Sequence, residues 1–146
     1  MHNRGLNNFY LFREDEHKSP SATYIKKPNT KADKKRSSED FKHIRCRHCE
    51  NIIADTNALF SMRQGRTSLV FSNPAGVLFE ILTLLYAQNL TFMGTPTSEF
   101  SWFSQYSWQV AVCSNCLNHL GWCYHAIYGE EPSIFYGLIR AELIIT

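Results

Sequence analysis

The sequence predicts an all-β domain built around a structural zinc site, and three observations support this. From residue 41 onward, short runs of β-branched and aromatic residues alternate with turn residues. Four of the five cysteines form two Cys-x-x-Cys pairs, which 63 residues separate. All three tryptophans lie between residues 102 and 122, around the second pair. We therefore expect two distant segments to meet at one metal ion, with an aromatic pocket beside it.

Seven runs are strand candidates, and turn residues separate them. The stretch 77–87 is ambiguous, because Leu, Ala and Glu also favour helices, but the Asn-Pro-x-Gly turn before it favours a strand. The expected strands cover residues 52–54, 67–71, 77–86, 90–93, 109–113, 122–128 and 135–145. The expected breaks lie at residue 65 and at residues 73–76, 94–96 and 129–132. Strands this short and this regularly spaced are typical of an all-β domain.

Charge divides the chain into two parts. Residues 1–40 carry nine Lys/Arg and six Asp/Glu with little to bury, which predicts a disordered or weakly ordered basic tail. Its basic cluster, residues 26–36, is either a nuclear signal, a contact for an anionic surface or a solvated linker. Residues 41–146 carry six Lys/Arg and seven Asp/Glu and form the predicted zinc-binding β domain. No nucleic-acid partner is expected for this domain, since phosphate binding needs clustered cations.

No membrane partner is expected, because no uninterrupted apolar run reaches the length of a membrane span. The first residues also lack the apolar segment of a secretory signal. Together with an odd number of cysteines, these features indicate a reducing, cytoplasmic setting with metal-bound thiolates.

The predicted metal ligands are four thiolates for one Zn²⁺. Two residues between cysteines let a tight turn present both sulfurs, and two such turns complete a tetrahedron. Because all four positions are filled, the zinc is expected to be structural and not catalytic. The predicted ligands are Cys46, Cys49, Cys113 and Cys116. As an alternative, His48 or His119 could replace one of these cysteines.

The fifth cysteine, Cys123, has two interpretations: a redox nucleophile or a small buried residue of a strand. No Ser/His/Asp set or carboxylate pair has a spacing that indicates hydrolysis. We therefore expect a protein that is not an enzyme.

The tryptophans have two interpretations as well. Trp102, Trp108 and Trp122 could wall a small apolar box, or they could be ordinary core residues. Gly121 leaves room for a close approach beside Trp122. The spacing alone leaves both open.

Five sequence motifs follow one another in a characteristic order and spacing. They are Ile44-Arg45-Cys46-Arg47-His48-Cys49, Asn73-Pro74-Ala75-Gly76, Pro96-Thr97-Ser98-Glu99-Phe100-Ser101-Trp102-Phe103 with Tyr106-Ser107-Trp108, Cys113-Ser114-Asn115-Cys116 and His119-Leu120-Gly121-Trp122. Together they resemble the CULT domain, the thalidomide-binding domain of cereblon, from about Phe41 to the C-terminus. The resemblance implies a β-tent fold, in which two antiparallel sheets are pinned together by the zinc.

The resemblance also implies a ligand: a glutarimide or other cyclic imide, or a uracil-like or uridine-like ring, including cyclic imides on the termini of aged or cleaved protein chains. The three tryptophans would be walls and Tyr124 the floor. Asn73 and Pro74 would lie on a covering loop. Backbone groups of Phe100 and Trp102 would bind the imide, and Glu99 and Ser101 complete the predicted ligand-binding set.

Three departures limit what the resemblance implies. Ala75 and Val77 replace larger residues on the covering loop, so selectivity beyond the imide ring is not carried over. Phe100 stands where cereblon has a histidine, a change that a backbone contact should tolerate. Cereblon's Lon-like domain, which attaches it to a ubiquitin ligase, has no counterpart, so no ubiquitin-ligase adaptor role is expected. The chain is similar to the single-domain members of bacteria.

Three rival functions remain. The two Cys-x-x-Cys turns, called knuckles below, also resemble those of methionine sulfoxide reductase B. That enzyme needs a catalytic cysteine on a late strand, and no cysteine follows Cys123. Three aromatics with Glu99 nearby could read methyl-lysine or another quaternary ammonium group. A pure interaction module is the third.

Overall fold

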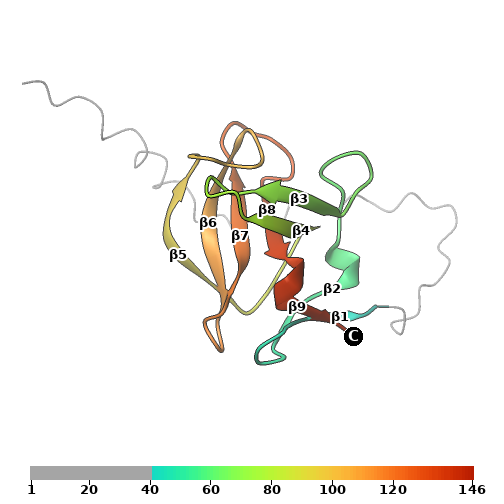
Figure 1. Ribbon diagram of the computed structural model, residues 1–146. Coiled ribbons are helices and arrows are strands. Elements are labelled where there is room, and N and C mark those ends of the chain that lie inside the picture. Colours follow the sequence, from blue (N-terminus) through green and yellow to red (C-terminus); the bar gives the residue numbers. More distant parts are fainter. Residues whose placement is uncertain (1–40) are drawn as a thin grey trace, which may run out of the picture. The chain divides into compact units, whose positions relative to one another are not determined.

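The structure is a computed structural model that describes residues 41–146 (Figure 1). The tail predicted for residues 1–40 lies outside the described residues. The described part consists of strands with two short 3-10 helices, η2 and η3. In chain order they are β1 (His43–Cys46), β2 (Ile52–Asp55), η2 (Thr56–Ala58), β3 (Ser68–Ser72), β4 (Leu78–Leu84), β5 (Leu90–Thr97), β6 (Tyr106–Cys113), β7 (His119–Ala126), β8 (Ile134–Ile139), η3 (Arg140–Glu142) and β9 (Leu143–Ile145).

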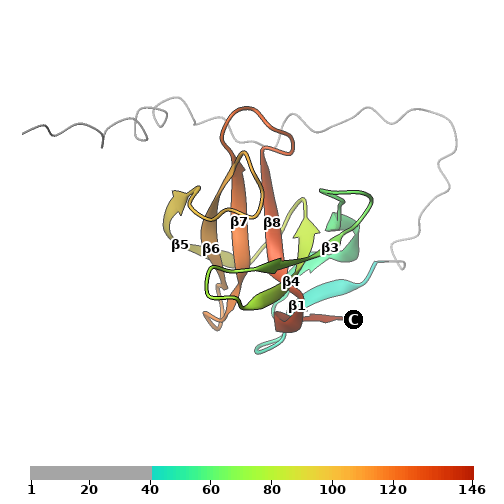
Figure 2. The same ribbon diagram turned by 45° about the horizontal axis from the view of Figure 1, so that its top comes forward.

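The strands form two sheets, and within each sheet all neighbouring strands pair in antiparallel orientation. The small sheet has the order β2-β1-β9, and the large one has the order β3-β4-β8-β7-β6-β5. In both views strands β5 to β8 stand side by side, and β1 lies next to the labelled C-terminus (Figures 1 and 2). The predicted all-β fold of two antiparallel sheets is confirmed.

Three strand predictions were wrong in detail. Strand β1 was missed because four residues, of which only Ile44 and Cys46 are buried, give too short a pattern. The run 135–145 is two strands in different sheets, and η3 interrupts it without a Gly or Pro signal. The expected break at 94–96 lies inside β5, where the register shifts between Met93 and Thr97. An edge strand tolerates Pro96 and a bulge at Gly94, because one side of it has no partner.

The buried side chains form two clusters. The first is mostly aliphatic and includes Ile44, Leu120 and Leu143 together with Cys46 and Cys113. The second is aromatic and consists of Phe103, Tyr106, Tyr124 and Phe135. The first therefore lies under the cysteine pairs, and the second lies under the tryptophans, which pack against it.

Two glycines let β7 and β8 approach closely. A β-carbon at Gly121 would lie 2.1 Å from the carbonyl oxygen of Gly137, and the Gly121 φ of +152° also disfavours a side chain. The close approach predicted at Gly121 is thus present, although within β7 and not at a corner. A β-carbon at Gly137 would lie 2.9 Å from the ring of Tyr124. Gly137 therefore leaves the space that the Tyr124 ring occupies.

Candidate functional site

The four predicted cysteines meet in one cluster. Their Sγ atoms all lie within 4.8 Å of one another, with 3.6 Å from Cys46 to Cys116 and 3.5 Å from Cys49 to Cys113. Four sulfurs bound to one Zn²⁺ at 2.3 Å would lie about 3.8 Å apart. The donor set and its spacing therefore fit a tetrahedral zinc ion. His48 and His119 are not part of the cluster.

The two cysteine knuckles have the same backbone geometry. In each, the residue after the second cysteine is left-handed, with φ +60° at Glu50 and +61° at Leu117. That residue donates its N–H to the carbonyl of the first cysteine at 2.8 Å in both knuckles. The next residue is an asparagine whose carbonyl accepts the N–H of the first cysteine at 2.9 Å. The shared geometry aims both pairs of sulfurs at one point.

The knuckles join the two sheets. Cys46 ends β1 of the small sheet, and Cys113 ends β6 of the large sheet. Glu142 bridges them, since its Oε2 accepts a bond from Asn118 at 2.8 Å and lies 3.3 Å from His48 Nε2. Arg47 of the first knuckle donates to the carbonyl of Ala141 at 2.7 Å. A metal at this point would fix both sheets and η3 together.

The cysteines differ in proton affinity without the metal. The side chain of Asn115 is the main cause that lowers the pKa of Cys49 to about 6, and burial raises the pKa of Cys46 to about 12. Zinc binds thiolates, so its binding would release the proton of Cys46.

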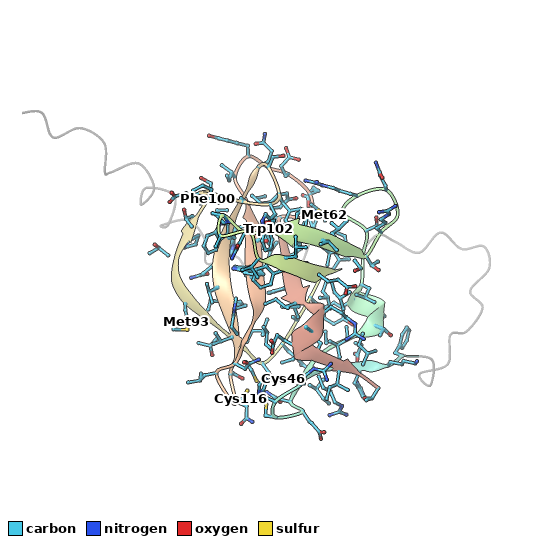
Figure 3. All side chains as sticks on the ribbon, in the orientation of Figure 1. Cys46, Met62, Met93, Phe100, Trp102 and Cys116 are labelled. Atoms are coloured by element: carbon cyan, nitrogen blue, oxygen red, sulfur yellow. The ribbon has the colours of Figure 1, made fainter. Side chains whose placement is uncertain are left out.

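A pocket of about 270 Å³ opens at the other end of the domain. Figure 3 shows Phe100 and Trp102 at one end and Cys46 and Cys116 at the other. The expectation that the aromatic pocket lies beside the metal is therefore wrong, because β6 and β7 carry the chain from the knuckles to the opposite end. The pocket is lined by Asn73, Pro74, Phe100, Trp102, Trp108, Trp122 and Tyr124.

Trp102 lies on the loop between β5 and β6. Its ring stacks on Phe71 at 5.1 Å between centroids and 7° between planes. The ring of Trp122 meets it edge-on at 4.9 Å. The indole Nε1 of Trp102 donates to the carbonyl of Ser72 at 3.0 Å, and the backbone carbonyl of Trp102 accepts a bond from Arg63 at 3.2 Å. Trp102 is therefore fixed by the β3–β4 hairpin and by the loop before β3.

Trp108, Trp122 and Tyr124 lie on one face of the large sheet. Trp108 pairs with Tyr124 across β6 and β7, and Trp122 lies two residues before Tyr124 on the same face. Tyr124 stacks on Phe135 of the aromatic core at 4.8 Å. The indole of Trp108 donates to the carbonyl of Glu99 at 2.8 Å, which ties the loop to the sheet.

Phe100 has an unusual backbone on this loop. Its φ is +55°, which is uncommon for a bulky residue, and its side chain is 68% exposed. Among residues 41–146, nothing hydrogen-bonds to the N–H or C=O of Phe100 or to the N–H of Trp102. Two donors and one acceptor are thus free on two residues that line the pocket.

Seven of the nine predicted ligand-binding residues line the pocket, and two do not. Glu99 contributes its carbonyl to Trp108, and Ser101 donates its hydroxyl to the carbonyl of Phe103 at 3.0 Å. Asn73 lines the pocket and also shapes the hairpin turn, because its Oδ1 accepts the N–H of Val77 at 2.9 Å. None of the lining residues is charged.

Three residues that support the pocket were not predicted. Phe71 and Phe79 contact Trp102, and Phe79 also meets Trp122 at 5.5 Å. Arg63 reaches the carbonyl of Trp102. The sequence gives no alternation that would single out Phe71 and Phe79, because their neighbours Val70 and Leu78 are also apolar, and only the β3–β4 pairing brings the two rings together.

Cys123 lies away from the pocket. It stands between Trp122 and Tyr124 on β7, so its side chain points to the opposite face of the sheet. It is buried, and burial raises the pKa of its thiol to about 12. A thiolate nucleophile at the pocket would need the reverse of both properties.

Comparisons with known proteins agree on the relationship of this chain. The family described as "Yippee zinc-binding/DNA-binding /Mis18, centromere assembly" matches residues 42–135. Protein cereblon of Danio rerio is 35% identical over 103 residues, which cover 69% of this chain and 24% of the relative. Protein cereblon of Gallus gallus is 37% identical over 101 residues, which cover 68% of this chain and 23% of the relative. The chain thus spans about a quarter of the length of these relatives.

A solved structure is similar in fold. The crystal structure of the Mis18 "Yippee-like" domain aligns with a TM-score of 0.50 at 18% identity, covering 73% of this chain and 95% of that one. At this identity the likeness concerns the fold alone. None of the helices in residues 41–146 has the length and apolar character that a membrane crossing requires.

Proposed function

This chain belongs to the Yippee zinc-binding/DNA-binding/Mis18 family, as a cereblon-related member, and we propose that its aromatic pocket binds a flat, neutral ring with an imide edge. Glutarimide and uracil-like rings both carry such an edge. We propose equally that the four cysteines hold one structural Zn²⁺. In this proposal the chain binds its ligand and does not catalyse a reaction.

The free backbone groups of the Phe100–Trp102 segment are the main support. An imide presents an acceptor, a donor and an acceptor along one edge. The free C=O of Phe100 can accept the imide N–H, and the free N–H groups of Phe100 and Trp102 can donate to its carbonyls. Phe100 and Trp102 both line the pocket, so the polar edge of a ligand can take the place of the solvent at these three groups.

The walls of the pocket favour a neutral ligand. A quaternary ammonium reader needs aromatic faces and gains from a carboxylate, but Glu99 is not among the lining residues. The volume of about 270 Å³ is near the lower limit of ordinary ligand pockets and suits a single ring. Two or three hydrogen bonds of about 1 kcal/mol each, with about 2–3 kcal/mol for one buried ring, correspond to a dissociation constant of tens to hundreds of micromolar.

A catalytic role has little support in these residues. The four thiolates leave no open position on a zinc ion, and Cys123 is buried on the opposite face of the sheet. Nucleic acid is not proposed as a partner either, because residues 41–146 carry six Lys/Arg against seven Asp/Glu. Free metabolites with a uracil-like ring and cyclic imides on protein termini are both compatible with the pocket.

Calorimetry on the zinc-loaded protein would compare four compounds: glutarimide, N-methylglutarimide, uridine and a trimethyllysine peptide. The proposal predicts micromolar binding of glutarimide, weaker or similar binding of uridine, and no binding of the N-methyl compound, whose donor is blocked. Binding of the trimethyllysine peptide alone would instead establish an ammonium reader. If none of the four compounds binds, the proposal fails, and a module for protein interaction is the remaining candidate function.

A further inference from the structure

The turn at residues 63–66 lies beside the pocket although none of its residues lines it. Gln64 and Gly65 have φ values of +50° and +72°, and Arg66 donates its N–H to the carbonyl of Arg63 at 3.0 Å. Two left-handed central residues are the mark of a tight two-residue hairpin turn. The turn pairs Arg63 with Arg66, so the two arginines occupy equivalent positions.

The two arginines differ in what they contact. The guanidinium of Arg63 donates to the carbonyl of Trp102 at 3.2 Å and lies over the rings of Phe71 and Phe103, at 5.9 and 5.7 Å from their centroids. The side chain of Arg66 makes none of these contacts. No carboxylate pairs with Arg63 among the described residues, whose close ion pairs involve His43 and His48. The closest partners of the Arg63 charge are therefore the Trp102 carbonyl and the two rings, while Glu130 and Glu131 line a second pocket with Arg63 but lie beyond ion-pair distance.

Phe71 and Phe103 connect Arg63 to the pocket. Phe71 is the ring on which Trp102 stacks, and Phe103 is the buried residue that follows Trp102 in the chain. Phe103 also meets Tyr124, the floor of the pocket, at 4.8 Å. One side chain thus contacts the carbonyl of Trp102, the ring behind Trp102 and the ring beneath the pocket.

We infer that Arg63 is a positioning residue, which sets the orientation of Trp102 and of its peptide groups before a ligand binds. The inference rests on the proposed function, because it assigns Arg63 to the same pocket. Arg63 would fix the carbonyl of Trp102 and press its ring against Phe71, which leaves the free N–H of Trp102 aimed at the ligand. Without Arg63, that loop loses its side-chain hydrogen bond to the turn at residues 63–66 and keeps only apolar packing against residues 60–62. A planar guanidinium suits this position, because it can stack on a ring and donate in its plane at once.

The first test uses the protein without ligand. The three indole N–H groups give separate signals in a ¹H–¹⁵N spectrum, which single Trp→Phe variants would assign. Arg63→Ala should shift or broaden the signal of Trp102, whose indole donates to Ser72, and leave that of Trp108, which donates to Glu99, unchanged. Arg66→Ala is the matched control and should change neither. An unmoved Trp102 signal in Arg63→Ala would overturn the inference.

The second test measures glutarimide affinity of the zinc-loaded proteins. Arg63→Ala should weaken binding about ten-fold, the effect of one charge-assisted hydrogen bond, while Arg66→Ala stays within about two-fold. Both arginines are exposed, so both variants should melt near the wild-type temperature. Equal affinities for wild type and Arg63→Ala would contradict the inference. If wild-type protein binds no imide, the proposed function fails, and the indole signals alone then decide whether Arg63 positions Trp102.

Discussion

The two ends of this domain are built from different contacts. At the cysteine end, four cysteine sulfurs converge, aliphatic side chains fill the core, and the backbone of both knuckles is bonded in the same way. At the aromatic end, rings pack edge-on and stacked around a cavity, and three backbone groups stay unbonded. The first end is closed and the second is open, and under the proposed function the first would stabilise the fold and the second would bind the ligand.

The strands β6 and β7 connect these ends. Cys113 is the last residue of β6, and Trp108 lies five residues earlier on the same strand. His119 begins β7, and Trp122 and Tyr124 follow on it. The same two strands, with the turn that joins them, thus carry metal ligands at one end and the pocket floor at the other, with a register shift between Ala111 and Val112 separating the two parts. The pocket rim, in contrast, comes from the β3–β4 turn and the loop around Phe100, which carry no metal ligand.

Removal of zinc should have the largest effect. A chelator at neutral pH, or Cys113→Ser, should unfold residues 41–146, because the metal contributes on the order of the whole stability of a domain, about 5–15 kcal/mol. Circular dichroism during titration with the chelator would follow the loss of β structure. Cys123, which is not in the cluster, provides the control, since the Cys123→Ser variant should still bind zinc. A chelated protein that still melts cooperatively would show that the two ends are stable separately.

A pair of core substitutions would separate the two ends. Phe135 is fully buried among Phe60, Phe103, Tyr106 and Tyr124, so Phe135→Ala should cost about 3–5 kcal/mol and also weaken imide binding. Leu143→Ala at the cysteine end should cost about 2–5 kcal/mol and leave binding unchanged. Urea unfolding and calorimetry would measure both quantities. Equal losses of affinity in the two variants would mean that the ends are not independent.

Gly137→Ala tests how the sheet supports the pocket floor. The new β-carbon would lie 2.9 Å from both the Tyr124 ring and the Ile81 Cγ2 atom, so a shift of the Tyr124 ring is expected at a cost of about 1–3 kcal/mol. Imide affinity should fall with it. Gly129→Ala is a control, because nothing lies within 4 Å of its β-carbon position, although its φ of +71° adds some strain. Unchanged affinity in Gly137→Ala would remove Tyr124 from the proposed floor.

Trp108→Phe removes one hydrogen bond and keeps a ring. The loss of the indole bond to the carbonyl of Glu99 should cost about 1 kcal/mol and weaken imide binding about five-fold, because the loop carrying Phe100 loses its attachment to β6. Calorimetry would measure the affinity. Tyr128→Phe, at an exposed position, should change nothing. A Trp108→Phe variant with wild-type affinity would mean that the loop is held by its other contacts.

Cys123 should show the smallest effect. With its thiol buried and its pKa raised to about 12, it should react very slowly with iodoacetamide at pH 8 in the zinc-loaded protein. Denatured, zinc-free protein should react at all five cysteines. Mass spectrometry of the digested protein would give the rate at Cys123. Rapid labelling of the folded protein would reopen the redox interpretation.

The cysteine end was more predictable from the sequence than the aromatic end. Ligand spacing in a Cys-x-x-Cys pair is local, so the four residues could be named before any strand was placed. Strand β1 could not be predicted in this way, since its four residues are defined by their pairing with β2 and β9. The supports of Trp102 were missed for the same reason: Phe71 and Phe79 come together only through the β3–β4 hairpin, and Arg63 only through the fold of the turn before it. The unbonded groups of Phe100 depend on a left-handed φ that no sequence pattern indicates.

The proposed imide pocket is tested most directly by tryptophan fluorescence of the zinc-loaded protein during titration with glutarimide. All three tryptophans of the chain line the pocket, so a bound ring should change much of the total signal. We predict saturable quenching in the micromolar range by glutarimide and none by N-methylglutarimide. An unchanged spectrum up to millimolar glutarimide would contradict the account, and the aromatic end would then have to be regarded as core.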